Sequence, residues 1–310
     1  MAVTLPHEAD RLFYTDGGME TTFIYLDGMD LPEFASFPLL DSADGREALR
    51  RYYHSYMRIA AKRGAGYVLD APTWRANRDW GARLGYDATD LERLNRDAIS
   101  FMRELAAESG IDGIIVSGLV GPRGDGYLVA EAMSAEEATD YHAPQLRALA
   151  GAGADMATAL TIAYADEAIG VARAASEAGI PAVISLTTET DGRLPDGEVL
   201  GHAIERVDTA APGAVAYFMV NCAHPAHFAD ALPTDAPWLA RIHGVRANAS
   251  TMSHAELDAS TGLHRGDPED LASRYAGLMD KIPGLNVLGG CCGTDDQHLA
   301  AIDEAIAQRA

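Results

Sequence analysis

The sequence predicts an α/β fold, a single (β/α)8 TIM barrel over residues 1–310, on three observations. Short apolar or β-branched runs alternate with longer helical patterns, as in βαβ units. Eight such strand–helix pairs fit into the 310 residues, and no low-complexity segment or linker divides them. A doubly wound sheet is the alternative, but Asp16-Gly17-Gly18-Met19 after the first predicted strand lacks the spacing of a dinucleotide-binding turn.

The predicted strands are short and are bounded by helical or turn-forming segments. In chain order they cover residues 12–16, 67–71, 113–117, 155–160, 182–186, 214–221, 239–245 and 286–290. In a barrel of this kind the chemistry lies in the loops that follow the strands.

The intervening segments carry apolar residues at helical spacing, which predicts one buried face per helix. These residues are Leu49, Tyr53, Tyr56 and Ala60 in one helix, Leu91, Leu94, Ala98, Met102 and Leu105 in the next, and Leu299, Ile302 and Ile306 in the last. Ser134 and Glu137 form a capping-box pattern, and Thr294 with the two aspartates after it marks the start of the last helix.

Two long irregular stretches interrupt the regular pattern, at residues 22–45 and 248–267. Loops of this length in a barrel are usually functional lids or partner surfaces. We therefore expect them on the active face, either closing over a substrate or forming the interface of a homo-oligomer.

The composition excludes several classes of function. The formal charge of −22 repels phosphate backbones and anionic membranes, so neither nucleic acid nor membrane is an expected partner. The longest apolar run, 214–220, is too short to span a bilayer, and the N-terminus lacks the features of a signal peptide, so we predict a cytoplasmic protein. The two lysines, Lys62 and Lys281, fall in predicted helices, which argues against Schiff-base chemistry.

All three cysteines follow predicted strands: Cys222 ends the sixth, and the adjacent Cys291 and Cys292 end the eighth. Adjacent cysteines are unsuited to bridging each other, whereas strand ends on one face of a barrel can bring three thiolates to one ion. Soft sulfur ligands select zinc, so we predict Zn²⁺ on these three residues at the C-terminal face of the strands. Three protein ligands leave one tetrahedral position open for a thiol substrate, which the metal would deprotonate.

Glycines and histidines near the cysteines bear on the same site. Gly289, Gly290 and Gly293 are expected to let the chain bend so that both adjacent cysteines face the metal. His224 and His227 also have a spacing suited to zinc, in place of or beside one cysteine of the pair. Other histidines carry less information, since His202 lies on a predicted solvated helix face and His243, inside the seventh strand, is either a core residue or a pocket donor.

Gly-Gly-Cys-Cys-Gly-Thr at 289–294, Asn-Cys at 221–222 and Asp-Gly-Gly at 16–18 resemble motifs of the homocysteine S-methyltransferase family, which includes betaine– and S-methylmethionine–homocysteine methyltransferases. The likeness spans nearly the whole chain. It implies a zinc-dependent S-methyltransferase that moves methyl from an onium donor (S-methylmethionine, betaine or a related sulfonium) to a small thiol, most directly homocysteine, giving methionine. It also implies that Asp16 binds the homocysteine ammonium and that backbone amides near Gly17 and Gly18 bind its carboxylate.

Two further residues are candidates for substrate contact. Trp74, after the second strand, is placed to face an onium methyl group by cation–π attraction, with a core position as the alternative. Asn221, beside Cys222, either orients a ligand and donates to a thiolate sulfur or packs at the strand end.

One position departs from the family. Where the family commonly has Glu-Thr-Ile-Pro after the fourth strand, this chain has Leu160-Thr161-Ile162-Ala163, so a carboxylate for the homocysteine ammonium is absent. Glu189 or Glu20 is placed to supply that charge from a neighbouring strand end, and otherwise the acceptor is a different thiol or a selenol.

Two other functions would use the same three cysteines. A zinc-dependent lyase or hydrolase would hold water at the open position, although three thiolates make bound water a weaker acid than neutral histidines do. A zinc or thiol sensor would report metal occupancy or cysteine oxidation without turnover.

Overall fold

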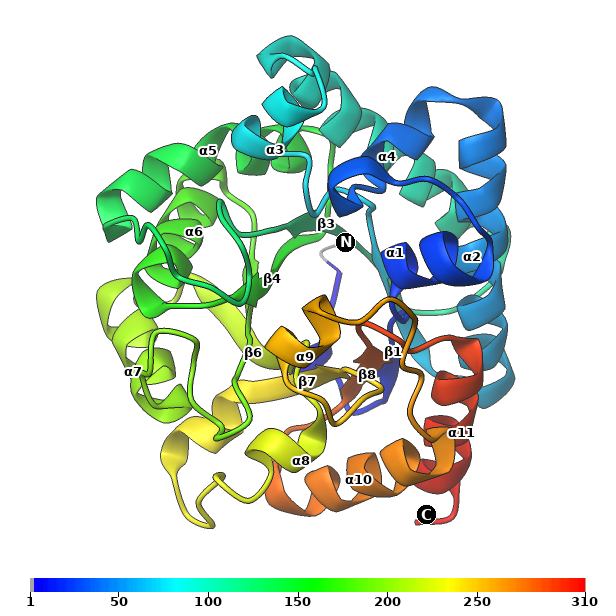
Figure 1. Ribbon diagram of the computed structural model, residues 1–310, viewed down its shortest axis with the longest axis vertical. Coiled ribbons are helices and arrows are strands. Elements are labelled where there is room, and N and C mark those ends of the chain that lie inside the picture. The colour runs from blue at the N-terminus through cyan, green and yellow to red at the C-terminus, as the bar shows by residue number, and fades with distance from the viewer. Residues whose placement is uncertain (1–2, 310) are drawn as a thin grey trace.

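The computed structural model describes residues 3–309 and confirms the (β/α)8 barrel (Figure 1). Eight parallel strands pair in chain order, and β1 closes the barrel by pairing with β8. The strands are β1 (Phe13–Tyr14), β2 (Gly66–Asp70), β3 (Ile114–Val120), β4 (Met156–Ile162), β5 (Ala182–Leu186), β6 (Val215–Asn221), β7 (Ile242–Ala247) and β8 (Val287–Gly290).

The longer helices form a ring around the strands, and α9 (His254–Asp258) lies over the barrel opening (Figure 1). In chain order the α-helices are α1 (Met19–Thr21), α2 (Ala43–Arg63), α3 (Arg78–Arg83), α4 (Ala88–Ser109), α5 (Ala135–Gly151), α6 (Ala165–Ala178), α7 (Leu200–Ala210), α8 (Pro225–Phe228), α9, α10 (Pro268–Lys281) and α11 (Asp296–Ala307). All the apolar residues predicted to share helix faces in α2, α4 and α11 are buried, which confirms that the helical spacing marks the side packed on the barrel.

The barrel interior is filled at its N-terminal end. A separate apolar cluster takes residues from seven strands, including Phe13, Val68, Ile115 and Tyr217, and Leu5 of the N-terminal segment packs on it. The interior is therefore closed at this end, and the opposite end, where the strands terminate, is left for a site.

Helix starts follow the expected chemistry with one shift. Ser134 accepts a hydrogen bond from the backbone N–H of Glu137 in a complete capping box, as predicted. The last helix is capped by Asp295 rather than Thr294, because the Asp295 side chain accepts from the N–H groups of Gln297 and His298.

Several predicted strand limits were wrong. The first strand covers only Phe13–Tyr14, and the third and fourth run on to Val120 and Ile162. The seventh begins at Ile242, because Pro237–Arg241 forms a 3-10 helix with proline at its first turn. His243 therefore lies near the start of β7, where its ring contacts those of His7 and Tyr217 at the end of the barrel away from the strand C-termini, and it is not a pocket donor.

The long loops after β1 and β7 are partly helical. The first contains a short π-helix at Thr22–Leu26 and two 3-10 turns, and the second contains α9. In Figure 1, α9 and its flanking loop cross the barrel opening. Within residues 3–309, no helix is long and apolar enough to cross a membrane.

Candidate functional site

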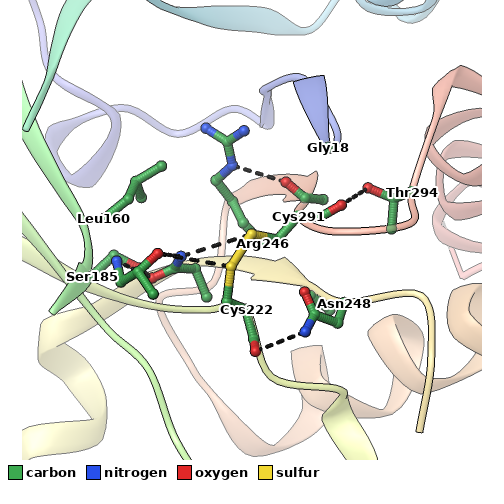
Figure 2. Close-up of a disulfide and its surroundings, with 12 residues drawn as sticks. Gly18, Leu160, Ser185, Cys222, Arg246, Asn248, Cys291 and Thr294 are labelled. Atoms are coloured by element: carbon green, nitrogen blue, oxygen red, sulfur yellow. Dashed lines mark hydrogen bonds between the residues drawn. A yellow bond between two sulfur atoms is a disulfide. The ribbon is translucent and has the colours of Figure 1, made fainter. Parts of the chain in front are cut away.

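The three cysteines meet at the C-terminal ends of β6 and β8. Their sulfur atoms lie within 4.8 Å of one another. Cys222 and Cys291 are joined by a disulfide, with their Cα atoms 5.4 Å apart, while Cys292 is a free thiol (Figure 2). The bridge was not predicted, since sequence reasoning considered only the adjacent pair. Two barrel strand ends thus bring together residues 69 positions apart.

The backbone around the cysteines is constrained in two different ways. Cys222 has φ of 53° and Gly293 has φ of 79°, so the chain turns through the left-handed region at both points. Gly289 and Gly290 are ordinary strand residues, and a Cβ on either would overlap the side chain of Thr15 or Thr294. The expectation that all three glycines bend the chain is therefore right for Gly293 alone. Gly289 and Gly290 instead leave room for the side chains of Thr15 and Thr294.

Asn221 holds the strand ends behind the sulfur atoms. Its amide oxygen accepts from Thr161 N at 2.9 Å and from Ser185 Oγ at 2.7 Å. Its Nδ2 donates to Thr161 Oγ1 at 2.9 Å and lies 3.9 Å from Cys291 Sγ. Asn221 is fully buried and does not line the cavity described next, so it ties β4, β5 and β6 together beneath the cysteines.

A cavity of about 380 Å³ opens above the cysteines, a size suited to a small ligand. Seven of the eight residues predicted for the site line it: Asp16, Gly17, Gly18, Trp74, Cys222, Cys291 and Cys292. Leu160 lines it too. Both long loops form its walls, with Tyr25 and Phe34 from the first and His254 and Leu257 from the second.

A buried charge cluster that the sequence reasoning missed lies at the cavity floor. The Arg246 guanidinium donates to Asp16, to Asp70 Oδ2 at 2.5 Å and to the Gly290 carbonyl at 3.0 Å. Burial raises the pKa of Asp16, and burial together with the charge of Asp16 raises the pKa of Asp70 to about 7, against the pull of Arg246. One guanidinium thus serves two buried carboxylates, and the pKa of Asp70 lies close to neutral pH.

The Asp70→Asn variant tests whether the pKa of Asp70 is raised in the folded protein. Because the folded-state pKa of Asp70 is raised from 3.8 to about 7, its contribution to stability is full below about pH 4 and is lost as the pH rises through about 7. Asparagine cannot ionise and keeps an oxygen acceptor for Arg246. We expect D70N to lose less stability than wild type between about pH 4 and about pH 7, as measured by urea unfolding. Asp208→Asn, at the one-third-exposed partner of Arg241, serves as the control, and parallel profiles for D70N and wild type would refute the assignment.

The free thiol Cys292 faces Tyr127. Burial and the charge of Glu20 raise the pKa of Cys292 to about 11, and a hydrogen bond from the Tyr127 hydroxyl opposes this shift. Tyr127 stacks on His254 with ring centroids 3.9 Å apart. A thiol in this setting stays protonated at neutral pH unless a cation stabilises its thiolate.

The candidates to replace the missing carboxylate differ in position. Glu20 lines the cavity and accepts from Ser36 Oγ at 2.8 Å. Glu189 lies outside it and faces His254 Nδ1 at 3.2 Å. At the position of the missing carboxylate, the Leu160 backbone carbonyl accepts from the Trp74 indole N–H at 3.1 Å. Of the two glutamates, Glu20 is the better placed because it lines the cavity.

The histidines proposed as alternative ligands point elsewhere. His224 Nδ1 accepts from Ala226 N at the start of α8, and His227 Nε2 lies 2.9 Å from the Thr251 carbonyl oxygen. Neither lines the cavity, and over residues 3–309 the only three-residue group with metal-ligand spacing is the cysteine trio. His202 is exposed on α7, as expected of a solvated face.

Comparisons with known proteins identify the family. The sequence model of a family described as Homocysteine S-methyltransferase matches residues 14–306. Methionine synthases from Mycobacterium leprae and Mycobacterium tuberculosis are 31% identical over 146 residues and 32% identical over 145. Each alignment covers 45% of this chain, which spans only 11% of those longer proteins.

Solved structures show the same fold. The oxidized form of the homocysteine methyltransferase MmuM from Escherichia coli matches with a TM-score of 0.75 and 21% identity, covering 99% of this chain and 100% of that one. Its metallated form matches with a TM-score of 0.72 and 20% identity, covering 96% of each chain.

Proposed function

The chain belongs to the homocysteine S-methyltransferase family, and from this premise we propose that it transfers a methyl group from an onium donor to a small thiol, with homocysteine as the first acceptor to test. The observation that carries the proposal is the convergence of three cysteine sulfurs within 4.8 Å at the floor of a ligand-sized cavity. Three convergent sulfurs with an adjoining cavity suit a metal that keeps one position for a substrate.

The donor set fits zinc. Sulfur atoms bonded to one tetrahedral zinc at about 2.3 Å lie roughly 3.8 Å apart. All three cysteine sulfurs already lie within 4.8 Å of one another, and reduction of the Cys222–Cys291 bond would let those two sulfurs separate to the spacing that zinc requires. The Cys222–Cys291 disulfide withholds two of the three sulfurs, so the metal-binding form is the reduced chain. Zinc held by Cys222, Cys291 and Cys292 would favour the thiolate form of an acceptor thiol at neutral pH.

The remaining cavity residues bind and align the two substrates. Asp16 and the backbone of Gly17 and Gly18 are proposed to hold the polar end of the thiol, close to Cys291. A Cβ on Gly18 would lie 2.5 Å from the Cys291 carbonyl oxygen, so only glycine permits this approach. Trp74 and Tyr127 offer aromatic surface to an onium group, and α9 with its loop limits access of water.

The test is metal content together with methyl transfer. The reduced protein is assayed for zinc and incubated with homocysteine and, in turn, S-methylmethionine, betaine and dimethylsulfoniopropionate, and products are identified by mass spectrometry. About one zinc per chain with methionine formed is the expected result. Zinc without any methylated thiol, over homocysteine and other small thiols, would reject the transferase proposal.

The Leu160→Glu variant tests how the acceptor is recognised. The substitution restores a carboxylate where the family commonly has one. A charged hydrogen bond from the homocysteine ammonium to this carboxylate should lower the KM for homocysteine about 10-fold. The KM for 4-mercaptobutyrate, which is homocysteine without the amino group, should not fall. Leu160→Gln is the matched control of similar size without charge. Equal KM values for homocysteine in the two variants would show that the ammonium does not reach residue 160.

A further inference from the structure

The wall of the cavity contains a second arginine, Arg75, in the loop after β2. Its guanidinium carbon lies 4.5 Å from the ring centroid of Trp74 and 3.4 Å from that of Trp80. The guanidinium thus lies over both indole rings, and Arg75 lines the same cavity as the cysteines.

Arg75 has no partner of its own over the described part of the chain. It makes no ion pair or hydrogen bond there, and its buried Nε is left without an acceptor. Arg246, by contrast, is bound to two carboxylates. Burial lowers the pKa of Arg75 to about 10, although Glu20 and Asp125 raise it from a distance. A guanidinium that is mostly removed from water and lacks an acceptor is costly, and a ligand carboxylate would supply two matching hydrogen bonds.

Apart from Arg246, which is paired with Asp16 and Asp70, the other charged residues named here are acidic. Glu20, Asp125 and Asp258 line the cavity together with the rings of Trp74 and Tyr127. Carboxylates and aromatic faces attract an alkylated cation, whereas Arg75 attracts an anion. The cavity thus presents groups suited to both charges of a zwitterion, with Tyr127, Glu20, Asp125 and Asp258 available to the cation because Arg75 already lies over the Trp74 ring.

We propose that Arg75 binds the carboxylate of the onium methyl donor and is the residue that selects such donors over alkylated amines or sulfoniums without a carboxylate. The inference rests on the proposed function for the identity of this ligand as a methyl donor. Arg75 is a binding residue in this scheme, because it takes no part in the transfer of the methyl group.

Binding of matched ligand pairs tests the inference in the reduced, zinc-loaded protein without any thiol. The pairs are betaine with choline, and dimethylsulfoniopropionate with (3-hydroxypropyl)dimethylsulfonium, in which an alcohol replaces the carboxylate. Titration calorimetry gives the affinities, and tryptophan fluorescence reports on Trp74 and Trp80. We expect the carboxylate member of at least one pair to bind roughly 10- to 100-fold more tightly.

Variants assign that preference to one side chain. Arg75→Gln should abolish the tighter binding of the carboxylate ligand. Arg83→Gln should retain it, because Arg83 stacks on the same Trp80 ring at 4.4 Å but is exposed and outside the cavity. Equal affinities within every pair, or a preference that survives in R75Q, would overturn the inference.

Methyl transfer measured separately distinguishes the two proposals. Thiol methylation without any carboxylate preference would leave the proposed function standing and remove this inference. An Arg75-dependent preference in a protein that methylates no thiol would uphold carboxylate binding and remove the proposed function.

Discussion

Replacing any one of the three cysteines by alanine is expected to remove zinc and methyl transfer together. Loss of a directly bound sulfur should weaken metal binding by more than about 100-fold, because changes in outer-shell partners alone cost roughly 10- to 100-fold. Bound zinc in C222A, C291A and C292A should therefore fall from about one per chain to below about 0.1 after dialysis. Elemental analysis of protein reduced before loading gives the measurement, since the Cys222–Cys291 bridge would otherwise withhold two sulfurs.

His227→Ala is the matched control for the cysteine variants. His227 lies five residues after Cys222, has a side chain able to bind zinc and faces the Thr251 carbonyl instead of the cavity. It should keep full zinc and full activity. Full metal content in all three cysteine variants would disprove the cysteine site, and loss of metal in H227A would reinstate the histidine alternative. Circular dichroism confirms that each variant is folded.

The fold was predictable because its signals are local. Helical spacing of apolar residues such as Leu94 and Ile302 depends only on the neighbouring turns, and each such face packs on the barrel. Strand limits were less predictable. Residues 239–241 were included in the predicted seventh strand, but they belong to the 3-10 helix Pro237–Arg241, which begins at a proline and takes them out of the ladder.

The cysteines and most of the cavity were predictable because a barrel places all strand C-termini on one face. The hydrogen-bond and ion-pair partners of the polar residues in the site were not predictable. Asp16 was predicted to bind a substrate ammonium, which stays a prediction, but the hydrogen bond that it accepts from Arg246 was not foreseen. A buried ion pair between residues 230 positions apart leaves no local pattern. The available signal was the placement of Asp70 and Arg246 at strand ends that face the same opening.

Arg75 was passed over for a related reason. It follows Trp74, and the aromatic residue drew the interpretation toward cation–π contact with a ligand. In the structure the cation nearest Trp74 belongs to the chain itself. Sequence cannot tell whether an arginine will find a carboxylate, and the proposal for Arg75 depends on the absence of such a partner over residues 3–309.

Arg246→Met is expected to destabilise the protein by about 3–5 kcal/mol, because it leaves Asp16 and Asp70 buried without their shared cation. Methionine keeps a similar length, so the loss is one of charge and hydrogen bonds more than of packing. Urea unfolding at neutral pH gives the magnitude. The deficit should shrink as the pH falls toward about 4, because protonation of the two aspartates removes the uncompensated charge.

Arg206→Met separates burial from ion pairing as such. Arg206 also bridges two carboxylates, Asp166 and Glu198, at 2.6 Å each, but its side chain is 47% exposed. Its loss should cost at most about 1 kcal/mol, since water solvates the carboxylates that remain. Adding Asp70→Asn to R246M should restore part of the lost stability, because one of the two unpaired carboxylates is then neutral. Equal costs for R246M and R206M, or no rescue by D70N, would mean that the buried cluster does not hold the strand ends together electrostatically.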